Sequence, residues 1–274
     1  MREIRFMVIW LGTKCNLKCK QCGTLIPYLE DMEYDINKII ENINYITRKV
    51  RLANIQIQGG EPFLYEGLST LLEKCAQNNQ IGHITIASNA TLMPNETCID
   101  ILRAYRDKID VRYSTYRCVK KEYRQNIINK LIDNGVNANT YNFMFGNDKW
   151  YDSGIFQEYK ADKESILKLY KECANRHCWT LADDWLVNCA KVLSLMVLLN
   201  RKDYSENNAV NVTEAREKNK DIEKILDEYD YRYLNDVPVM CGYCKGTGEM
   251  IDPAIQTTQK EIEEYRKIFR ENMQ

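Results

Sequence analysis

The sequence predicts an α/β protein with a parallel sheet, and three observations support this. The first half alternates strand-length runs of β-branched and aromatic residues with amphipathic helical patterns. Such alternation gives parallel strands, because each helix returns the chain to the same end of the sheet. After about residue 150 the elements shorten and cysteines cluster. We expect a partial (β/α) barrel over residues 1–155 and a small α+β module over residues 156–274.

Five runs have the length and composition of strands: residues 4–11, 53–58, 83–88, 109–115 and 138–145. Five strands are too few to close an eight-stranded barrel, so an open or partial barrel is expected. In parallel α/β sheets the ligand site lies at the carboxyl ends of the strands. The loops that follow these strands are therefore the expected site of chemistry.

Apolar residues at helical spacing predict the helices between these strands. One pattern covers residues 36–50, with Asp35 as N-cap, and others cover residues 68–75 and 123–132. A weaker helix is opened by Asn95. Cys75 and Cys98 lie on apolar faces of these helices and are expected to be core residues.

The second half predicts different elements. A short helix near residues 164–173 is followed by "CWTLADDWLVNC", which resembles a hairpin turning at Asp183–Asp184. An Asn-rich stretch, residues 203–211, precedes a helix over about residues 222–229 and the loop "CGYCKGTGE". Thr258 and Glu261 form a capping box for a final helix.

Composition and charge limit the classes of binding partner that can be expected. The 274 residues are 45% hydrophobic and 28% charged, and the formal net charge of −1 gives no electrostatic reason to expect nucleic acid or an anionic membrane. The longest apolar run, residues 192–199, is too short to span a bilayer and is expected to be a buried strand or helix turn. The N-terminal "MREIRF" lacks the features of a signal peptide. We expect a cytoplasmic protein.

Eleven cysteines in a cytoplasmic chain favour metal ligation over disulfides. Cys15, Cys19 and Cys22 follow the first predicted strand with the spacing C-x3-C-x2-C. Structural zinc needs four ligands, and neither His83 nor His177 is near in sequence. A 4Fe-4S cluster is normally held by four thiolates, so three would leave one iron open to another ligand.

This spacing resembles the signature of the radical S-adenosylmethionine (radical SAM) superfamily. "GGEP" follows the second strand, where members carry the motif for the amino group of SAM. The resemblance implies that Gly59, Gly60, Glu61 and Pro62 bind SAM; glycines allow close backbone approach, and the Glu61 carboxylate would pair with the ammonium.

Two further segments resemble SAM contacts of the family. "ASNA" ends the third strand and resembles an Asn-containing segment near the SAM ribose, which assigns Ser88 and Asn89 to the cofactor. Ala90 stands there where glycine is common. Ser114, near the end of the fourth strand, resembles another contact. Gln21 stands where an aromatic residue often stacks near adenine.

The resemblance implies a reaction and its partners. A reduced cluster on Cys15, Cys19 and Cys22 would cleave SAM to methionine and a 5′-deoxyadenosyl radical, which abstracts hydrogen from the substrate. An external one-electron reductant such as flavodoxin or ferredoxin would supply the electron.

The C-terminal cysteines form a second set. Cys178, Cys189, Cys241 and Cys244 resemble the ligands of the twitch domain, a shortened SPASM module that holds an auxiliary 4Fe-4S cluster. Zinc also suits four thiolates, and the cysteines could bind no metal. Asp184 stands where the family has glycine, and Cys173 lies close enough in sequence to replace Cys178.

The expected reaction is oxidation or epimerisation of a small polar substrate, of sugar or aminocyclitol type. Oxidation would use the auxiliary cluster as electron acceptor, whereas epimerisation needs a hydrogen donor, for which Cys118 and Cys173 are the candidates. The alternative is modification of a ribosomal peptide. The first strand starts at about residue 4, which leaves no room for a fused peptide-recognition domain. A more distant alternative is an iron–sulfur electron carrier without enzymatic activity.

Overall fold

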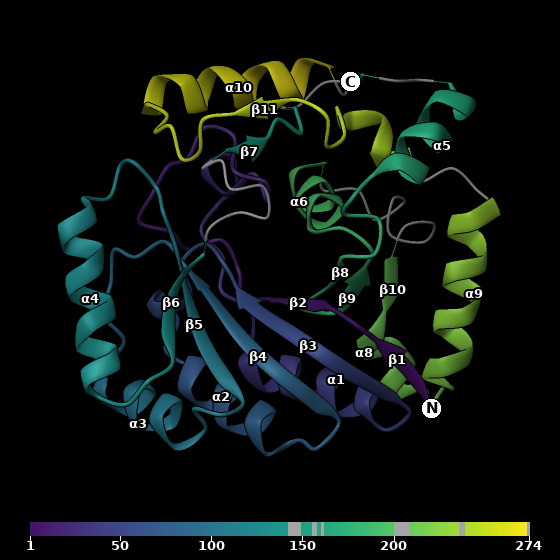
Figure 1. Ribbon diagram of the computed structural model, residues 1–274. Coiled ribbons are helices and arrows are strands. Elements are labelled where there is room, and N and C mark those ends of the chain that lie inside the picture. Colours follow the sequence, from purple (N-terminus) through teal and green to yellow (C-terminus); the bar gives the residue numbers. More distant parts are fainter. Residues whose placement is uncertain (142–148, 155–157, 160–161, 200–208, 236–238, 273–274) are drawn as a thin grey trace. The chain divides into compact units, whose positions relative to one another are not determined.

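The computed structural model describes every residue except 142–148, 155–157, 160–161, 200–208, 236–238 and 273–274 (Figure 1). The chain divides into two compact units. The first comprises residues 1–16, 31–148 and 181–184, and the second residues 17–30, 149–180 and 185–274. The boundary near residue 148 is close to the predicted 155, but residues 17–30 group with the C-terminal part, which the sequence did not indicate.

The first unit contains a parallel sheet in the order β2-β3-β4-β5-β6, with β1 also paired to β3. Its strands are β1 (Arg2–Ile4), β2 (Met7–Trp10), β3 (Val50–Gln58), β4 (Ile81–Ser88), β5 (Ile109–Ser114) and β6 (Ala138–Tyr141). The strand predicted over residues 4–11 is confirmed over Met7–Trp10, but its continuity back to Ile4 is wrong. The chain bends at Arg5 and Phe6, which are exposed, and the Asn54 side chain donates to the Arg5 carbonyl at 3.1 Å. The last residues of the fifth predicted run, 142–145, lie outside the described residues.

Four helices cover one face of this sheet (Figure 1): α1 (Ile36–Thr47), α2 (Leu68–Gln77), α3 (Glu96–Ala104) and α4 (Lys121–Asp133). Their caps confirm the sequence prediction. Asp35 Oδ1 accepts from Asn37 N at 2.8 Å, and Asn95 Oδ1 accepts from Cys98 N at 2.8 Å. Cys75 and Cys98 are buried in the core as predicted. A short 3₁₀ turn, η2 (Pro62–Leu64), follows β3.

The second unit is built from short elements. Its helices and 3₁₀ turns are η1 (Ile26–Tyr28), α5 (Lys163–Glu172), α6 (Ala190–Leu199), α8 (Val212–Glu217), α9 (Ile222–Asn235), η3 (Val239–Tyr243) and α10 (Gln259–Asn272). Two antiparallel pairs are described, β9 (Trp185–Val187) with β10 (Ala209–Asn211), and β7 (Trp150–Tyr151) with β11 (Met250–Ile251). The apolar run 192–199 is helical. The predicted Asn-rich stretch lies outside the described residues up to 208.

Two of the local turn predictions are confirmed. Strand β8 (Trp179–Ala182) ends at a turn in which Asp183 has a φ of 48°, as the predicted hairpin requires. Glu261 N donates to Thr258 Oγ1 at 3.2 Å, and Thr258 N donates to the Glu261 carboxylate at 2.8 Å, which is the reciprocal capping box. Within the described part of the chain, no helix combines the length and hydrophobicity needed to cross a membrane.

The last helix holds residues 17–30 in the second unit. Arg266 donates from Nε to the Tyr28 carbonyl at 3.0 Å and from Nη2 to the Leu29 carbonyl at 2.8 Å. Lys20 and Glu261 form an ion pair at 2.8 Å. These long-range contacts explain why the cysteine loop crosses the division: Cys15 belongs to the first unit, and Cys19 and Cys22 to the second.

Candidate functional site

The GGEP turn lies directly against the backbone that leads into Cys15. Gly60 N donates to the Gly12 carbonyl at 3.1 Å, and Glu61 N donates to the Lys14 carbonyl at 2.9 Å. A Cβ at Gly60 would lie 2.0 Å from the Lys14 carbonyl oxygen and 2.6 Å from Cys15 Cβ. Glycine is therefore required at this position, because real Cβ atoms do not approach backbone so closely.

The Glu61 side chain is surrounded by hydrogen-bond donors of the protein. Glu61 is fully buried, and its carboxylate accepts hydrogen bonds from Ser88 Oγ at 2.9 Å and from Asn89 N at 2.8 Å. A third donor is Phe63 N, at 3.3 Å. The carboxylate thus joins the GGEP turn to the segment after β4, and its pairing with the ammonium of SAM stays a prediction.

Burial raises the pKa of the Glu61 carboxyl group. Desolvation raises its pKa to about 7, although the hydrogen bonds from Asn89, Ser88 and Phe63 oppose the shift. Because the folded-state pKa lies above the usual value of 4.5, the contribution to stability is present below pH 4.5 and is lost as the pH rises through 7. The loss amounts to about 3 kcal/mol.

We expect Glu61→Gln to remove this pH dependence, since the glutamine side chain does not ionise in this pH range. Urea unfolding of the wild type should show a free energy of unfolding that falls more steeply between pH 5 and pH 8 than that of the variant. Over this range the free energy of unfolding of the wild type should fall by about 3 kcal/mol more than that of the variant. Parallel curves for the two proteins would show that Glu61 does not titrate there.

Asn89 connects the same segment to the cysteine loop. Its Nδ2 donates to Asn16 Oδ1 at 2.9 Å and points to Cys15 Sγ at 3.9 Å. The next residue, Ala90, is fully buried with a φ of 63°, the left-handed conformation that favours glycine. The structure therefore joins Gly60, Glu61, Ser88 and Asn89 in one network beside Cys15, and their contacts with SAM stay predictions.

Ser114 and Cys118 mark the corresponding end of β5. Ser114 is the last residue of the strand and is half-buried, while Cys118 lies in the following loop and is exposed. Partial desolvation raises the pKa of Cys118 above its usual value, so its thiol stays protonated at neutral pH. The roles of Ser114 as a SAM contact and of Cys118 as a hydrogen donor stay predictions.

Cys19 and Cys22 are held by residues of the second unit. Gln256 donates from Nε2 to Cys19 Sγ at 3.5 Å and accepts from Lys18 N through Oε1 at 2.8 Å. Backbone hydrogen bonds, Lys20 N to the Ile255 carbonyl and Thr257 N to the Lys18 carbonyl, both at 2.7 Å, fix the two segments together. Cys22 Sγ lies 3.3 Å from Thr24 Oγ1. No pattern in the sequence indicated Gln256.

These surroundings fit thiolate ligands of an iron–sulfur cluster. Each of the three sulfurs has a polar group of the protein at hydrogen-bond distance for sulfur: Asn89 for Cys15, Gln256 for Cys19 and Thr24 for Cys22. Such N–H and O–H donors stabilise anionic sulfur and orient it toward the metal. Each thiol is therefore suited to be a metal ligand, and the binding of one cluster by all three stays a prediction.

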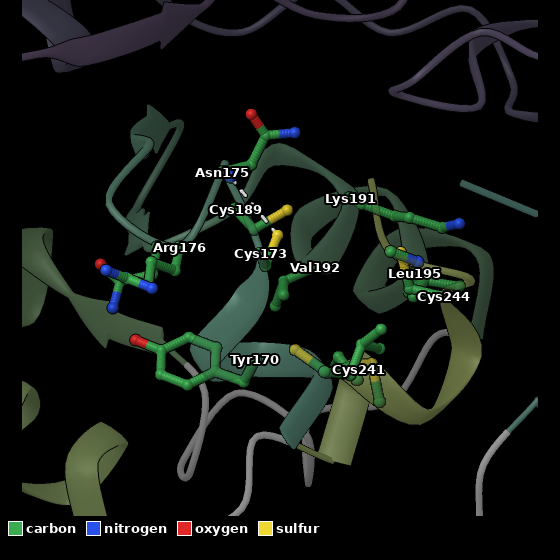
Figure 2. Close-up of a pocket in the computed structure, with 14 residues that line it drawn as sticks. Tyr170, Cys173, Asn175, Arg176, Cys189, Lys191, Val192, Leu195, Cys241 and Cys244 are labelled. Carbon is green, nitrogen blue, oxygen red and sulfur yellow. Dashed lines mark hydrogen bonds between the residues drawn. The ribbon is translucent and has the colours of Figure 1, made fainter. Parts of the chain in front are cut away.

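The second cysteine set surrounds a pocket within the second unit (Figure 2). Cys173 follows α5, Cys189 precedes α6, and Cys241 and Cys244 come from η3 and the residue after it. All four line the pocket, whereas the predicted ligand Cys178 does not. The structure therefore places Cys173 around the pocket with the other three, and the ligand role of Cys173 or Cys178 stays a prediction.

The four cysteines line a pocket but do not converge on the position of a single metal ion. Among the residues that the structure describes, no three cysteine, histidine or carboxylate side chains form a group that could hold a metal ion. A 4Fe-4S cube separates its ligand sulfurs more widely than one ion does. Asn175 N donates to Cys173 Sγ at 3.4 Å, and Gly246 N donates to Cys244 Sγ at 3.3 Å. These sulfurs already accept the hydrogen bonds that cluster ligands need.

Burial favours the protonated thiol of Cys173, Cys178, Cys189 and Cys241 by raising the pKa of each. Desolvation raises the pKa of Cys189 to about 11 and that of Cys178 to about 12, and it raises those of Cys173 and Cys241 as well. Lys191, which also lines the pocket, lowers the pKa of Cys189 and Cys241 against this effect.

The sheet of the first unit has one polar face. Parallel strands are usually apolar on both faces. Here the face away from the core carries polar side chains that lie in register across four strands, from Gln56 through Thr85 to Asp110, and from Arg112 to Asn139. The opposite face carries Ile55, Ile57, Ile84, Ile86, Ile109 and Val111, all buried.

Asp110 is the centre of this polar face. Its carboxylate accepts from Thr85 Oγ1 at 2.8 Å and from Arg112 Nε at 2.8 Å, and it lies 2.6 Å from His83 Nε2. Burial alone would raise the pKa of Asp110, but these hydrogen bonds outweigh it and lower the pKa. Asp110 is therefore charged at neutral pH and balances the guanidinium of Arg112, whose side chain is 40% exposed.

Two curated relatives are similar to this chain over part of its length. It is 28% identical over 138 residues to the GTP 3′,8-cyclase of Clostridium acetobutylicum, which covers 48% of this chain and 42% of the cyclase. The GTP 3′,8-cyclase of Thermodesulfovibrio yellowstonii is 31% identical over 99 residues, covering 34% of this chain and 30% of the cyclase. The chain thus spans less than half the length of these relatives.

A solved structure and a family model cover more of the chain. The crystal structure of BtrN in complex with AdoMet and 2-DOIA covers 94% of this chain and 98% of its own, with a TM-score of 0.56 and 13% identity, and it shares the fold. The family model of the radical SAM superfamily matches residues 11–152, which is more than half of the chain. The protein belongs to the radical SAM superfamily, and its first unit is the partial β/α barrel of that family.

Proposed function

We propose that this protein is a radical SAM dehydrogenase that oxidises a small hydroxyl-rich substrate, of sugar or aminocyclitol type. The observation that carries the proposal is the pocket lined by Cys173, Cys189, Cys241 and Cys244, which would hold a second 4Fe-4S cluster. Four thiolates occupy all four irons, so such a cluster can exchange electrons but cannot chelate a substrate.

Membership of the family implies one 4Fe-4S cluster and SAM. Cys15, Cys19 and Cys22 would hold the first cluster, and the backbone around Gly59 and Gly60, with Ser88 and Asn89, would surround SAM. When bound, these groups supply reductive cleavage of SAM, hydrogen abstraction and, at the second cluster, an electron acceptor. Flavodoxin or ferredoxin is the expected external reductant.

The protein itself would contribute position and specificity. Gly60 permits the close approach of the GGEP turn to the cysteine loop, and buried Glu61 locks that turn to Asn89. Neither residue needs to exchange a proton with the substrate. A rigid arrangement of this kind keeps the reacting atoms aligned.

The polar face of the sheet supports a polar substrate. Gln56 and Gln58 carry amides, which both donate and accept hydrogen bonds, as hydroxyl groups do. The charge of Arg112 is balanced by Asp110, so the face favours a neutral, hydroxyl-rich molecule over a polyanion. The solved structure of BtrN with AdoMet and 2-DOIA, which shares the fold over nearly its whole length, is consistent with this choice.

The test is product analysis with the anaerobically reconstituted, reduced protein. With candidate sugars, aminocyclitols and peptides, we expect 5′-deoxyadenosine together with a product two hydrogens lighter than one of the polyhydroxylated substrates. In the Cys173, Cys189, Cys241 and Cys244 to alanine variant, SAM cleavage should continue while oxidised product disappears.

Three results would contradict the proposal. Solvent deuterium in a product of unchanged mass would identify an epimerase, with Cys118 the residue to test. A modified peptide and no modified polyol would identify a peptide-modifying enzyme. Absence of 5′-deoxyadenosine with every substrate would leave an electron carrier.

A further inference from the structure

Lys191 is a buried cation in the second cysteine pocket, and the proposed function does not use it. It lies in the first turn of α6, two residues after Cys189, and is only 6% exposed. Together with Cys189, Cys241 and Cys244 it lines the pocket (Figure 2). Lysine is almost never fully buried unless it is paired, so its presence there requires a reason.

Backbone carbonyls hold the ammonium in place. Nζ donates to the carbonyl of Ser153 at 2.5 Å and to that of Gly154 at 2.9 Å. The nearby carboxylate of Asp152 is bonded to Lys245 at 2.6 Å and to Gly154 N at 2.9 Å. Two consecutive carbonyls, those of Ser153 and Gly154, therefore bind the ammonium of Lys191. Asp152 forms an ion pair with the half-exposed Lys245.

We propose that Lys191 sets the reduction potential of the second cluster by holding a positive charge beside its ligands. The inference rests on the proposed function, because the pocket must hold a cluster. Reduction adds one negative charge to the cluster, and a fixed cation in a poorly solvated site stabilises that added charge. The result is a stronger electron acceptor, which is the property that a dehydrogenase needs.

A purely structural role for Lys191 predicts a different sign. If the residue served only to tie residues 153–154 to α6, its loss would loosen the pocket and admit water. Water stabilises the more highly charged reduced state, so the potential would rise. If Lys191 instead acts through its charge, loss of that charge lowers the reduction potential of the cluster. The direction of the shift therefore separates the two roles.

The experiment is a redox titration followed by electron paramagnetic resonance. The full-length chain with Cys15, Cys19 and Cys22 changed to alanine serves as parent, so that only the second cluster gives a signal. Into it we place Lys191→Met, Lys191→Gln and Lys191→Arg. Lys171→Met is the matched control, because Lys171 lies two residues before Cys173 but is exposed and does not line the pocket.

We expect both neutral variants to shift the midpoint potential to more negative values by at least about 59 mV, a tenfold change in the one-electron equilibrium constant. Lys191→Arg and Lys171→Met should match the parent. Glutamine keeps an N–H donor for one carbonyl, so Lys191→Gln decides the question should Lys191→Met fail to take up iron.

An unchanged or raised potential in Lys191→Gln, with the cluster present, overturns this inference and leaves the proposed function intact. A parent chain that takes up no second cluster overturns both.

Discussion

The variant in which alanine replaces Cys15, Cys19 and Cys22 will form no 5′-deoxyadenosine from SAM under reducing conditions. These thiols supply the only protein ligands that the family signature offers to the first cluster, and without it SAM has no electron source. The variant should retain about four irons per chain, held by the second pocket, against about eight in the wild type.

Chromatography of the reaction mixture and iron analysis check this result together. The matched control changes Cys75 and Cys98, which are buried in the core and outside both clusters of cysteines, to serine or alanine one at a time. These controls should keep their iron. Undiminished SAM cleavage in the triple variant would contradict the assignment of the cysteine loop.

Gly60→Ala will have the second large effect. Its added methyl group would lie 2.0 Å from the Lys14 carbonyl oxygen and 2.6 Å from Cys15 Cβ, and neither is the end of a flexible side chain. The GGEP turn or the cysteine loop must move, and such overpacking costs about 1–3 kcal/mol. We expect SAM cleavage to fall about tenfold or more, which corresponds to 1.4 kcal/mol at the site.

Gly23→Ala is the matched control for that change. Gly23 directly follows Cys22 in the same loop, but apart from its two chain neighbours no residue has an atom within 4 Å of the position its Cβ would take. It should cleave SAM at the wild-type rate. Equal activities of Gly60→Ala and Gly23→Ala would show that the close approach of the GGEP turn does not matter for the reaction.

Most elements of the fold could be predicted because their signals are local. Asp35 and Asn95 lie within three residues of the backbone groups they cap, and Thr258 and Glu261 bond to each other. One exception is the bend at Arg5 and Phe6, where the Arg5 carbonyl accepts a hydrogen bond from the Asn54 side chain of a neighbouring strand. Contacts between distant residues leave no periodic pattern in the sequence.

The same limit applies to the site. Spacing identified the cysteines, but Gln256 reaches Cys19 from 237 residues further along the chain, and nothing local marks it. The carboxylate of Glu61 accepts hydrogen bonds from donors 27 and 28 residues away, and no local pattern predicts these contacts. Sequence also could not choose between Cys173 and Cys178, because both precede Cys189 by a plausible interval.

The account depends on a second cluster in the pocket lined by Cys173, Cys189, Cys241 and Cys244, and one measurement tests this most directly. It is the iron content per chain, with Mössbauer spectra, of Cys173→Ala and Cys178→Ala reconstituted side by side. Both thiols are half-buried, but only Cys173 lines the pocket and accepts a backbone hydrogen bond from Asn175. We predict about eight irons for Cys178→Ala and about four for Cys173→Ala. Full loading of Cys173→Ala, with loss of the second cluster in Cys178→Ala, would contradict the account.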